Sequence, residues 1–174
     1  MPTFGNTSAG DRSQSIMDTI VGSRFICPET CQPDSITALV SADDPSLRIK
    51  CAIYRRSDGK LMATTEEKTN LSSSFSWVTF NVNEPKPTLS GGIEYYLVAW
   101  GDGFYDPWTH LYYETWIRYS LNNNGAHQSQ TYDDWPDPWS PTETADRVHS
   151  IYCTYTPVAV PVKKVLGEGI VWIG

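Results

Sequence analysis

The chain has 174 residues, of which 13% are aromatic and 19% charged, and its formal net charge is −7. This length fits one domain with a sizeable core, and the aromatic-rich, charge-poor balance favours strands over helices. No run of Lys or Arg exceeds two residues, which argues against a nucleic-acid partner, and no apolar run approaches the roughly 18–20 residues of a membrane span.

The first predicted strands surround a turn that contains two prolines. A polar start rich in Gly and Ser includes a short predicted strand at residues 16–21. Residues 23–27 and 35–41 are predicted strands, and the prolines of CPETCQPD interrupt pairing between them. The second of these alternates, and its apolar face carries Ile36, Ala38 and Val40.

The next segments predict a hairpin followed by a central strand. Residues 47–55 and 60–65 flank an Asp-Gly turn of the kind that joins antiparallel strands. Residues 93–100, IEYYLVAW, form a near-continuous apolar run that suits the middle of a sheet. Further predicted strands cover residues 75–82, 111–119 and 146–156.

These elements together predict the fold class. Turn signals recur at intervals of roughly 8–12 residues, and no stretch shows sustained helical periodicity. We expect an all-β protein: an antiparallel two-sheet β-sandwich, jelly-roll-like, over residues 1–157, with an extended C-terminal tail at residues 158–174.

Residues 101–139 stand apart because they hold four of the seven tryptophans. Large aromatic rings on loops either cover the core or form a recognition surface. A pyranose ring stacks on such side chains, and the amides of residues 122–124, Gln128 and Gln130 could bind its hydroxyls. Alternatively the rings roof the sandwich or form a protein–protein interface. The candidate sugar-binding residues are Tyr105, Trp108, Tyr112, Trp116, Tyr132, Trp135 and Trp139.

Aspartates gather in the same segment. Paired carboxylates among aromatic rings are what a glycosidase uses, but here Asp often precedes Pro or Gly, which favours turn formation. No nucleophile, zinc-protease or phosphate-loop motif occurs, and the three histidines are scattered, so we expect no enzymatic activity. Loop carboxylates can also bind calcium, and the candidate ligands are Asp102, Asp106, Asp133 and Asp134.

The four cysteines fall into two kinds of position. Cys51 and Cys153 lie on apolar strand faces, where they could pair or remain buried thiols. Cys27 and Cys31 could close a small loop, whereas a zinc site lacks a nearby His. All four are therefore candidates for disulfide formation.

The tail ends in an uncharged apolar stretch. Exposed, such a segment is an aggregation hazard, so we expect it to be covered. The cover is either the domain's own sheet or that of a neighbouring subunit, joined by strand addition. The candidate interface residues are Ile170, Val171, Trp172 and Ile173.

The start of the chain bears on its location. Residues 1–13 have neither the basic stretch nor the apolar run of a secretory signal. We therefore expect either a mature chain with a new initiating Met or release by another route, such as lysis of a virion-producing cell. The sequons at Asn6 and Asn70 permit surface glycosylation.

The order of the pieces resembles a known class of domain. The pieces are FGNTSAG, GSRFICPE, DSITALVS, KCAIYRRSDGKLMATTEE, SWVTFNV, LSGGIEYYLVAWGDG and RVHSIYCTYTP. Over residues 3–157 they resemble jelly-roll β-sandwich domains of surface and virion proteins of archaea, bacteria and their viruses, which are similar to non-catalytic carbohydrate-binding modules. The resemblance implies the architecture and no fixed catalytic set. Cys51 and Cys153 stand where such domains often have a small residue, which indicates an added cross-link.

Two functions are therefore expected from the sequence. The first is a non-catalytic structural module of a virion or extracellular filament, a coat or decoration subunit that associates with itself or with other subunits. The second is a carbohydrate-binding module or adhesin that uses residues 101–139. Both place the protein on a virion surface or outside the cell.

Overall fold

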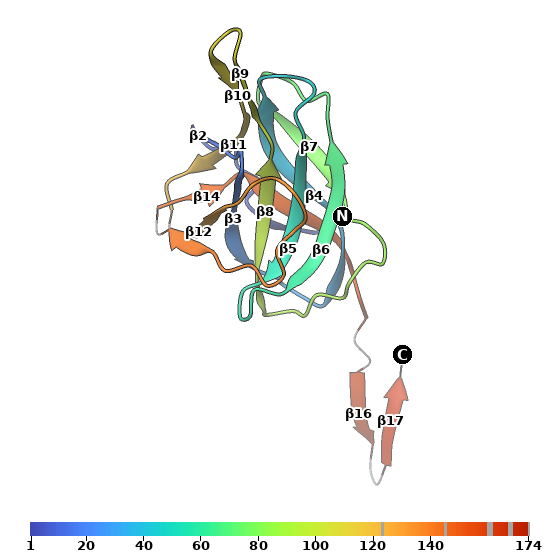
Figure 1. The fold of residues 1–174 in the computed structure, drawn as a ribbon. Helices are drawn as coiled ribbons and strands as arrows, with labels where there is room; N and C mark the ends of the chain where they lie inside the picture. The colour runs from blue at the N-terminus through green and yellow to red at the C-terminus, as the bar shows by residue number, and fades with distance from the viewer. Residues whose placement is uncertain (123, 145, 160–161, 167–168, 174) are drawn as a thin grey trace.

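The computed structural model describes residues 1–122, 124–144, 146–159, 162–166 and 169–173, and within these ranges every regular element is a strand. Two antiparallel sheets pack face to face (Figure 1), which confirms the predicted two-sheet sandwich. No helix in the described ranges is long and apolar enough to cross a membrane.

The first sheet, sheet A, is built around the long strand β4. Its strands run in the order β1 (Thr3–Gly5), β15 (Ile151–Pro157), β4 (Cys31–Ala42), β11 (Thr115–Ser120) and β14 (Val148–His149). Two more strands pair off this path: β2 (Arg12–Ser15) with β11, and β7 (Ser76–Asn81) with β4.

The second sheet, sheet B, has β8 near its middle. Its order is β13 (Thr142–Thr144), β12 (Gly125–Ser129), β3 (Thr19–Ile26), β8 (Glu94–Gly101), β5 (Ile49–Arg55) and β6 (Leu61–Lys68). Two hairpins stand outside both sheets. They are β9 (Phe104–Asp106) with β10 (Leu111–Tyr113), and β16 (Val162–Leu166) with β17 (Gly169–Ile173).

The core lies between the two sheets and follows the alternation of the strands. Ile36, Ala38 and Val40 of β4 point into it, as the 35–41 pattern predicts. From sheet B, Leu97 and Ala99 of β8 meet them. Burial of these apolar side chains is the main favourable contribution to folding.

The other face of β8 is buried as well, because the chain forms a further layer over the outside of sheet B. Tyr96, Val98 and Trp100 of β8 pack there against Trp139, with Tyr132 and Trp135 beside them. Residues 130–141 therefore cover the sheet. Burial on both faces explains why residues 93–100 read as a continuous apolar run rather than an alternating one.

Several strand boundaries differ from those predicted. The predicted strand at residues 111–119 is two elements: β10 belongs to the projecting hairpin and β11 to sheet A. The strand β4 begins at Cys31, within the proline-containing turn, because Pro33 pairs with Tyr155 where the register of β15 shifts by a bulge. The Asp-Gly hairpin is confirmed, with Gly59 at φ +67°.

Some short strands have no signal in the sequence. The strand β12 reads GAHQS, and β2 reads RSQS, so neither shows an apolar alternation. Pairing with a long neighbour, β3 or β11, holds them in the sheets. Tertiary context thus supplies what local propensity lacks.

Candidate functional site

The most prominent surface feature is the hairpin formed by β9 and β10, called here the aromatic hairpin (residues 104–113). It projects from the end of the sandwich at the top of Figure 1. Asp106 fixes its turn, because the carboxylate accepts hydrogen bonds from the backbone N–H of Trp108 (2.9 Å) and from Thr109 Oγ1 (2.8 Å). These bonds hold the pKa of Asp106 below its usual value, with the Trp108 bond the largest cause. The tip is therefore an ordered turn.

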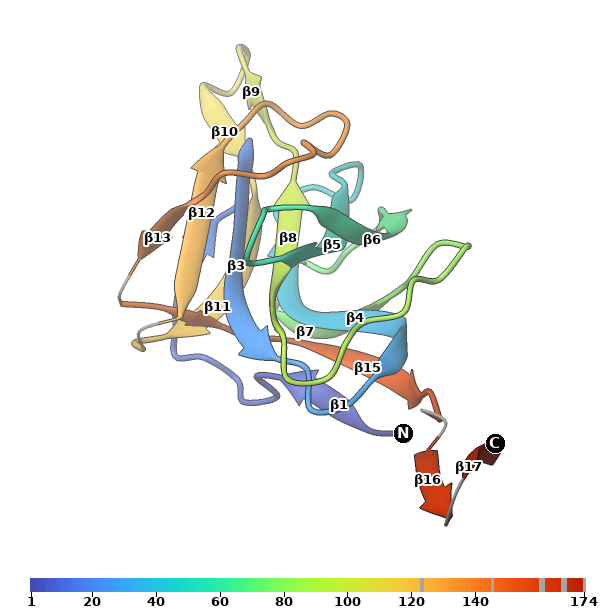
Figure 2. The ribbon, with the colours of Figure 1, turned by 90° about the horizontal axis from the view of Figure 1, so that it is seen from below.

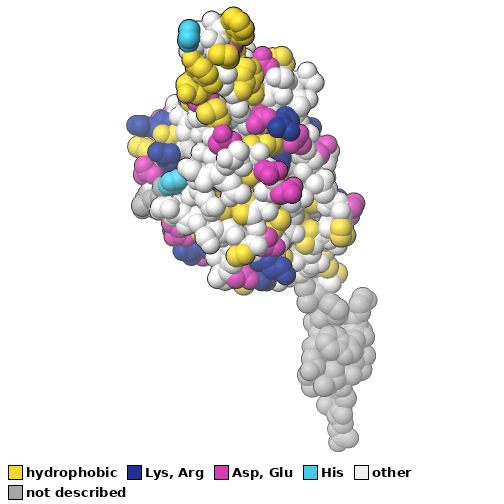
Figure 3. Space-filling model, viewed as in Figure 1, with side chains coloured by type: hydrophobic (Ala, Val, Ile, Leu, Met, Phe, Trp, Pro, Cys, Tyr) yellow, Lys and Arg dark blue, Asp and Glu magenta, His cyan; other side chains and the backbone are white. Residues whose placement is uncertain are grey.

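The aromatic hairpin exposes large apolar side chains together. Trp108 at the tip is 91% exposed and Tyr112 is 62% exposed, with Phe104, Tyr105 and Leu111 also on the surface. The rings of Tyr105 and Tyr112 lie 5.0 Å apart between centroids. Figure 3 shows the resulting apolar patch at this end of the molecule. Contiguous exposed apolar groups of this kind mark interaction sites.

Other rings of the 101–139 segment are placed elsewhere. Trp139 is only 1% exposed, and its ring packs against those of Tyr54 and Tyr96 at 5.2 Å each. Its backbone N–H donates to Gly59 O (2.9 Å), and a Cβ on Gly59 would lie 2.1 Å from Trp139 O. Trp116 lies on β11, where its Nε1 donates to Asp43 (3.1 Å). The seven candidate sugar-binding rings therefore divide among three places.

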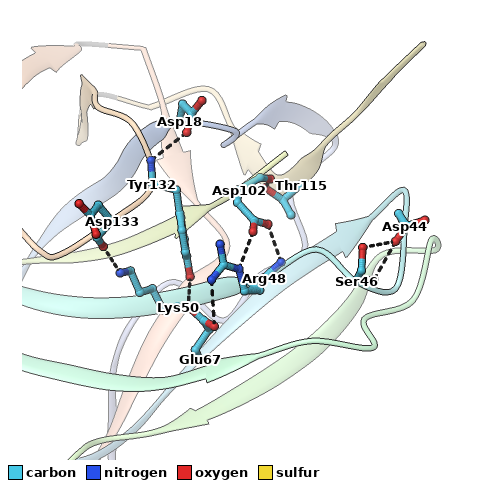
Figure 4. Close-up of polar contacts among 10 residues, drawn as sticks. All are labelled: Asp18, Asp44, Ser46, Arg48, Lys50, Glu67, Asp102, Thr115, Tyr132 and Asp133. Carbon is cyan, nitrogen blue, oxygen red and sulfur yellow. Dashed lines mark hydrogen bonds and ion pairs between the residues drawn. The ribbon is translucent and has the colours of Figure 1, made fainter. Parts of the chain in front are cut away.

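Tyr132 and Trp135 form, with Trp100, an aromatic cage around Lys50. The Lys50 ammonium lies 4.5, 4.7 and 5.2 Å from the ring centroids of Tyr132, Trp100 and Trp135. Figure 4 shows Lys50 beside Tyr132, where its ammonium donates to the carbonyl of Asp133. Burial lowers the pKa of Lys50. This contact is a cation–π interaction that ties residues 130–135 to sheet B.

An ion-pair network adjoins the cage. Tyr132 donates its hydroxyl to Glu67 (2.7 Å), and Arg48 lies 5.0 Å from the Tyr132 ring centroid (Figure 4). Arg48 also donates through its backbone N and its Nε to Asp102, both at 2.6 Å. Neither Lys50 nor Arg48 was singled out from the sequence. Lys50 lies opposite Trp100 through the pairing of β5 with β8, and Arg48, just before β5, lies beside Asp102 of the next loop; both positions depend on long-range pairing.

The four candidate calcium ligands are not brought together. Asp102 pairs with Arg48, and Asp106 holds the tip of the aromatic hairpin. Asp133 and Asp134 lie exposed in the covering loop. Among the residues that the structure describes, no group of three or more His, Cys, Asp or Glu side chains is arranged to hold a metal ion. Asp137, next to these, accepts a hydrogen bond from Leu61 N at 3.0 Å, as a turn former does.

The four cysteines are free and buried. Cys51 and Cys153 point into the core, as predicted, and burial raises the pKa of both thiols. The Sγ atoms of Cys27 and Cys31 lie 3.3 Å apart, so these two are in contact without a covalent bond. Cys51 and Cys153 remain small apolar residues of the core.

The structure also places the four candidate tail residues and the asparagines of the two sequons. Ile170, Val171, Trp172 and Ile173 lie in β17, whose backbone pairs with β16, while their side chains fall outside the described part of the structure. Asn6 is half-buried and donates to His149 O (3.1 Å), whereas Asn70 is exposed with φ +55°.

A pocket of about 890 Å³ lies beside the start of β8. Its lining includes Arg55, Arg56, Ile93, Glu94, Tyr95 and Glu143. Arg56 pairs with Glu143 (3.0 Å) and Glu94 (2.6 Å), and the hydrogen bonds to Glu143 and then to Glu94 raise the pKa of Arg56. Aromatic enrichment marks residues 101–139 in the sequence, whereas no comparable sequence signal marks the residues of this pocket.

The geometry thus offers one projecting apolar hairpin, one filled aromatic cage and one pocket with charged walls. None of the three is a recognisable catalytic arrangement of a nucleophile with its base. A comparison with protein-family models finds no matching family, and a comparison with curated proteins finds no match.

Proposed function

We propose that the protein is a non-catalytic assembly module, a subunit of a virion or extracellular filament that docks its aromatic hairpin on a neighbouring subunit. The observation that carries this proposal is the 91% exposure of Trp108 at the tip of a projecting, ordered turn. Water contact with such a surface is unfavourable, and a partner that covers it gains the corresponding free energy.

The composition of the aromatic hairpin favours a protein partner. Trp and Tyr are enriched among the residues that dominate binding energy at protein interfaces, where large rings anchor in pockets. The Asp106 bonds already fix the turn, so little conformational entropy is lost on docking. The nearby carboxylates of Asp102 and Asp106 are engaged in an ion pair and a turn, which supports a structural role.

Replacement of the exposed rings tests the proposal. We expect the protein to assemble with rising concentration, and Trp108→Ser combined with Tyr112→Ser to form smaller species at the same concentration, as measured by size-exclusion chromatography with light scattering and by electron microscopy. Leu121→Ser is the matched control, because Leu121 is 58% exposed but lies outside the hairpin. Equal assembly of the double variant and the control would refute the role of the hairpin.

The tail is a second contact in this proposal. The strand β17 pairs with β16 on one side, and a strand edge of this kind can accept a strand of a neighbour. A variant that ends at Pro157 lacks β16 and β17 but keeps the aromatic hairpin, so it tests the tail contact by itself. We expect it to form smaller assemblies than the full chain, and an unchanged size distribution would remove the tail from the proposal.

A second candidate function is glycan binding, favoured by the adjacency of Tyr105 and Tyr112 below Trp108. Exposed rings side by side can stack on successive sugar units. Glycan-array binding should then be lost on alanine substitution at these three positions. Binding that survives the triple substitution would rule this function out.

A further inference from the structure

We propose that Cys27 and Cys31 are a site of reversible oxidation, where a disulfide closes the loop that holds the base of the C-terminal tail. A low-molecular-weight disulfide is the oxidant. The site stands on its own chemistry and does not depend on the assembly function proposed above.

The two sulfur atoms already lie in contact. The Sγ atoms of Cys27 and Cys31 are 3.3 Å apart, and both side chains are 0% exposed. A disulfide bond is about 2.05 Å long, so the sulfurs need to approach by only about 1.3 Å. The Cys27 thiol also donates to Glu29 O (3.0 Å), and this weak bond is lost on oxidation. A movement of this size is within the reach of side-chain rotation.

One neighbouring segment fixes the backbone of both cysteines. Cys27 donates its N–H to Ile93 O (3.0 Å) and accepts a bond from Gly92 N (2.8 Å). Cys31 exchanges two backbone bonds with Leu89, at 3.0 and 2.8 Å. Residues 89–93 therefore hold the two cysteines at a constant spacing, which keeps the effective concentration of one thiol toward the other high.

The loop between the cysteines holds the place where the tail leaves the sandwich. Thr30 O accepts a hydrogen bond from the backbone N–H of Val158 (2.9 Å), the first residue after β15. Glu29 accepts a bond from the Tyr155 hydroxyl (3.1 Å). In the view from below (Figure 2), the end of β15 lies beside the start of β4, and the chain continues from there to β16. A covalent bond across the loop would therefore restrain the base of the tail as well.

The loop has little room to move while it is closed. Gly91 packs so closely on it that a Cβ there would lie 2.8 Å from Glu29 Cα and 2.9 Å from Thr30 N. Burial, and next the contact with Cys27, raises the pKa of Cys31. The Cys31 thiol is therefore protonated and shielded in the closed loop. A reagent reaches the pair only when the loop opens, so we expect oxidation to be slow.

The reaction balances as thiol–disulfide exchange. In the opened loop one cysteine thiolate attacks a sulfur of oxidised glutathione, which breaks the S–S bond and releases one glutathione thiol. The second cysteine then attacks the mixed disulfide, forms the bond between Cys27 and Cys31, and releases the second glutathione. Two protein thiols are oxidised while one small disulfide is reduced to two thiols. An oxidising environment outside the cell favours the disulfide, and an excess of small thiol reverses the reaction.

Thiol counting in the full chain tests the site without any substitution. Reduced protein is incubated with excess oxidised glutathione, unfolded, labelled with N-ethylmaleimide and weighed by mass spectrometry. We expect four labels before incubation and two afterwards, with no attached glutathione. Trypsin releases residues 25–48, a peptide that contains Cys27 and Cys31 and neither of the other cysteines. This peptide should lose both labels and become about 2 Da lighter than its unlabelled, reduced form, because two hydrogens leave.

Two variants separate the pair from the other buried thiols. Cys31→Ala should form no internal disulfide under the same conditions. Cys51→Ala, the control in the same core, should lose two labels at the rate of the unmodified protein. Circular dichroism verifies that each variant folds.

Amide hydrogen exchange tests the restraint on the tail. We expect the N–H of Val158 to exchange several-fold more slowly in the oxidised protein, because opening of the loop is what exposes its bond to Thr30 O. The exchange of β8 should not change. Equal exchange at Val158 in the two forms would overturn the statement that the disulfide holds the tail.

Three other outcomes overturn the site itself. Retention of all four labels in excess oxidised glutathione would show that the pair does not oxidise. A cross-link between the peptide of residues 25–48 and the peptide that contains Cys153 would assign the bond to a different pair. A lasting glutathione adduct would show that the second thiol does not reach the first. Each of these results leaves the proposed assembly function standing.

Discussion

At the scale of single residues, His149 is the buried group with the clearest pH consequence. Its Nδ1 lies 2.9 Å from Ser23 Oγ, while its Nε2 is shielded from water and has no hydrogen-bond partner among the residues that the structure describes. Burial lowers the pKa of His149 to about 3, and the positive charge of Arg147 adds to this. The imidazole is therefore neutral in the folded protein at neutral pH.

We predict that stability falls as the pH drops from 7 to 5. The unfolded chain takes up a proton near the usual pKa of about 6.5 while the folded protein does not, so acidification favours unfolding, by about 2 kcal/mol at pH 5. Urea unfolding at a series of pH values measures this loss. His149→Asn should flatten the slope between pH 7 and 5, and an unchanged slope would assign the loss to other groups.

The ammonium of Lys50 in its aromatic cage contributes to the stability of the fold. Lys50→Met keeps most of the apolar stem but removes the ammonium from its three rings and from Asp133 O. We expect a loss of about 1–2 kcal/mol in the free energy of unfolding, read by tryptophan fluorescence in urea. Lys60→Met, at an exposed position, is the control and should change little. Equal effects of the two would show that the cage contributes nothing.

At the scale of elements, the turn of the aromatic hairpin depends on one side chain. Asp106→Ala removes the acceptor for Trp108 N and Thr109 Oγ1. We predict several-fold faster amide hydrogen exchange at residues 108–110, with the exchange of β8 unchanged, because the hairpin opens independently of the sheets. Assembly should weaken in parallel. Asp134→Ala, on the covering loop, should leave the exchange of the hairpin as it was.

The same element shows where sequence patterns stop being informative. Asp106-Pro107-Trp108 and Asp137-Pro138-Trp139 are the same tripeptide, yet Trp108 is 91% exposed and Trp139 is 1% exposed. Local chemistry predicts a turn at both places. Whether the following ring meets water or the outer face of sheet B depends on Tyr54 and Tyr96, which are distant in sequence.

Strands whose pattern reflects a buried face could be predicted, and those held by neighbours could not. The alternation at residues 35–41 and the apolar run at 93–100 report burial directly, and both strands are where the pattern places them. The split after β10 has no periodic signature, because Glu114 simply carries the chain from the hairpin to sheet A. The candidate site was predicted as one segment, whereas long-range pairing divides its rings among three places.

At the scale of the whole molecule, the net charge opposes association between copies. Each chain carries −7, so copies repel one another over distances beyond the contact itself. We predict that assembly strengthens when salt rises from about 0.01 to about 0.15 M, because the Debye length falls from about 30 to about 8 Å. Sedimentation velocity at several salt concentrations measures this. Weaker assembly at higher salt would mean that attraction between opposite charges at the contact outweighs the repulsion between whole chains.

The unlike ends of the sandwich give any filament built from it a direction. Only one end of the sandwich carries the aromatic hairpin, so a filament whose contacts use the hairpin has two different ends, which can grow at different speeds. A single copy without the hairpin tryptophan would seal one tip and leave the other growing. The length of such a filament could then be controlled from one of its ends only.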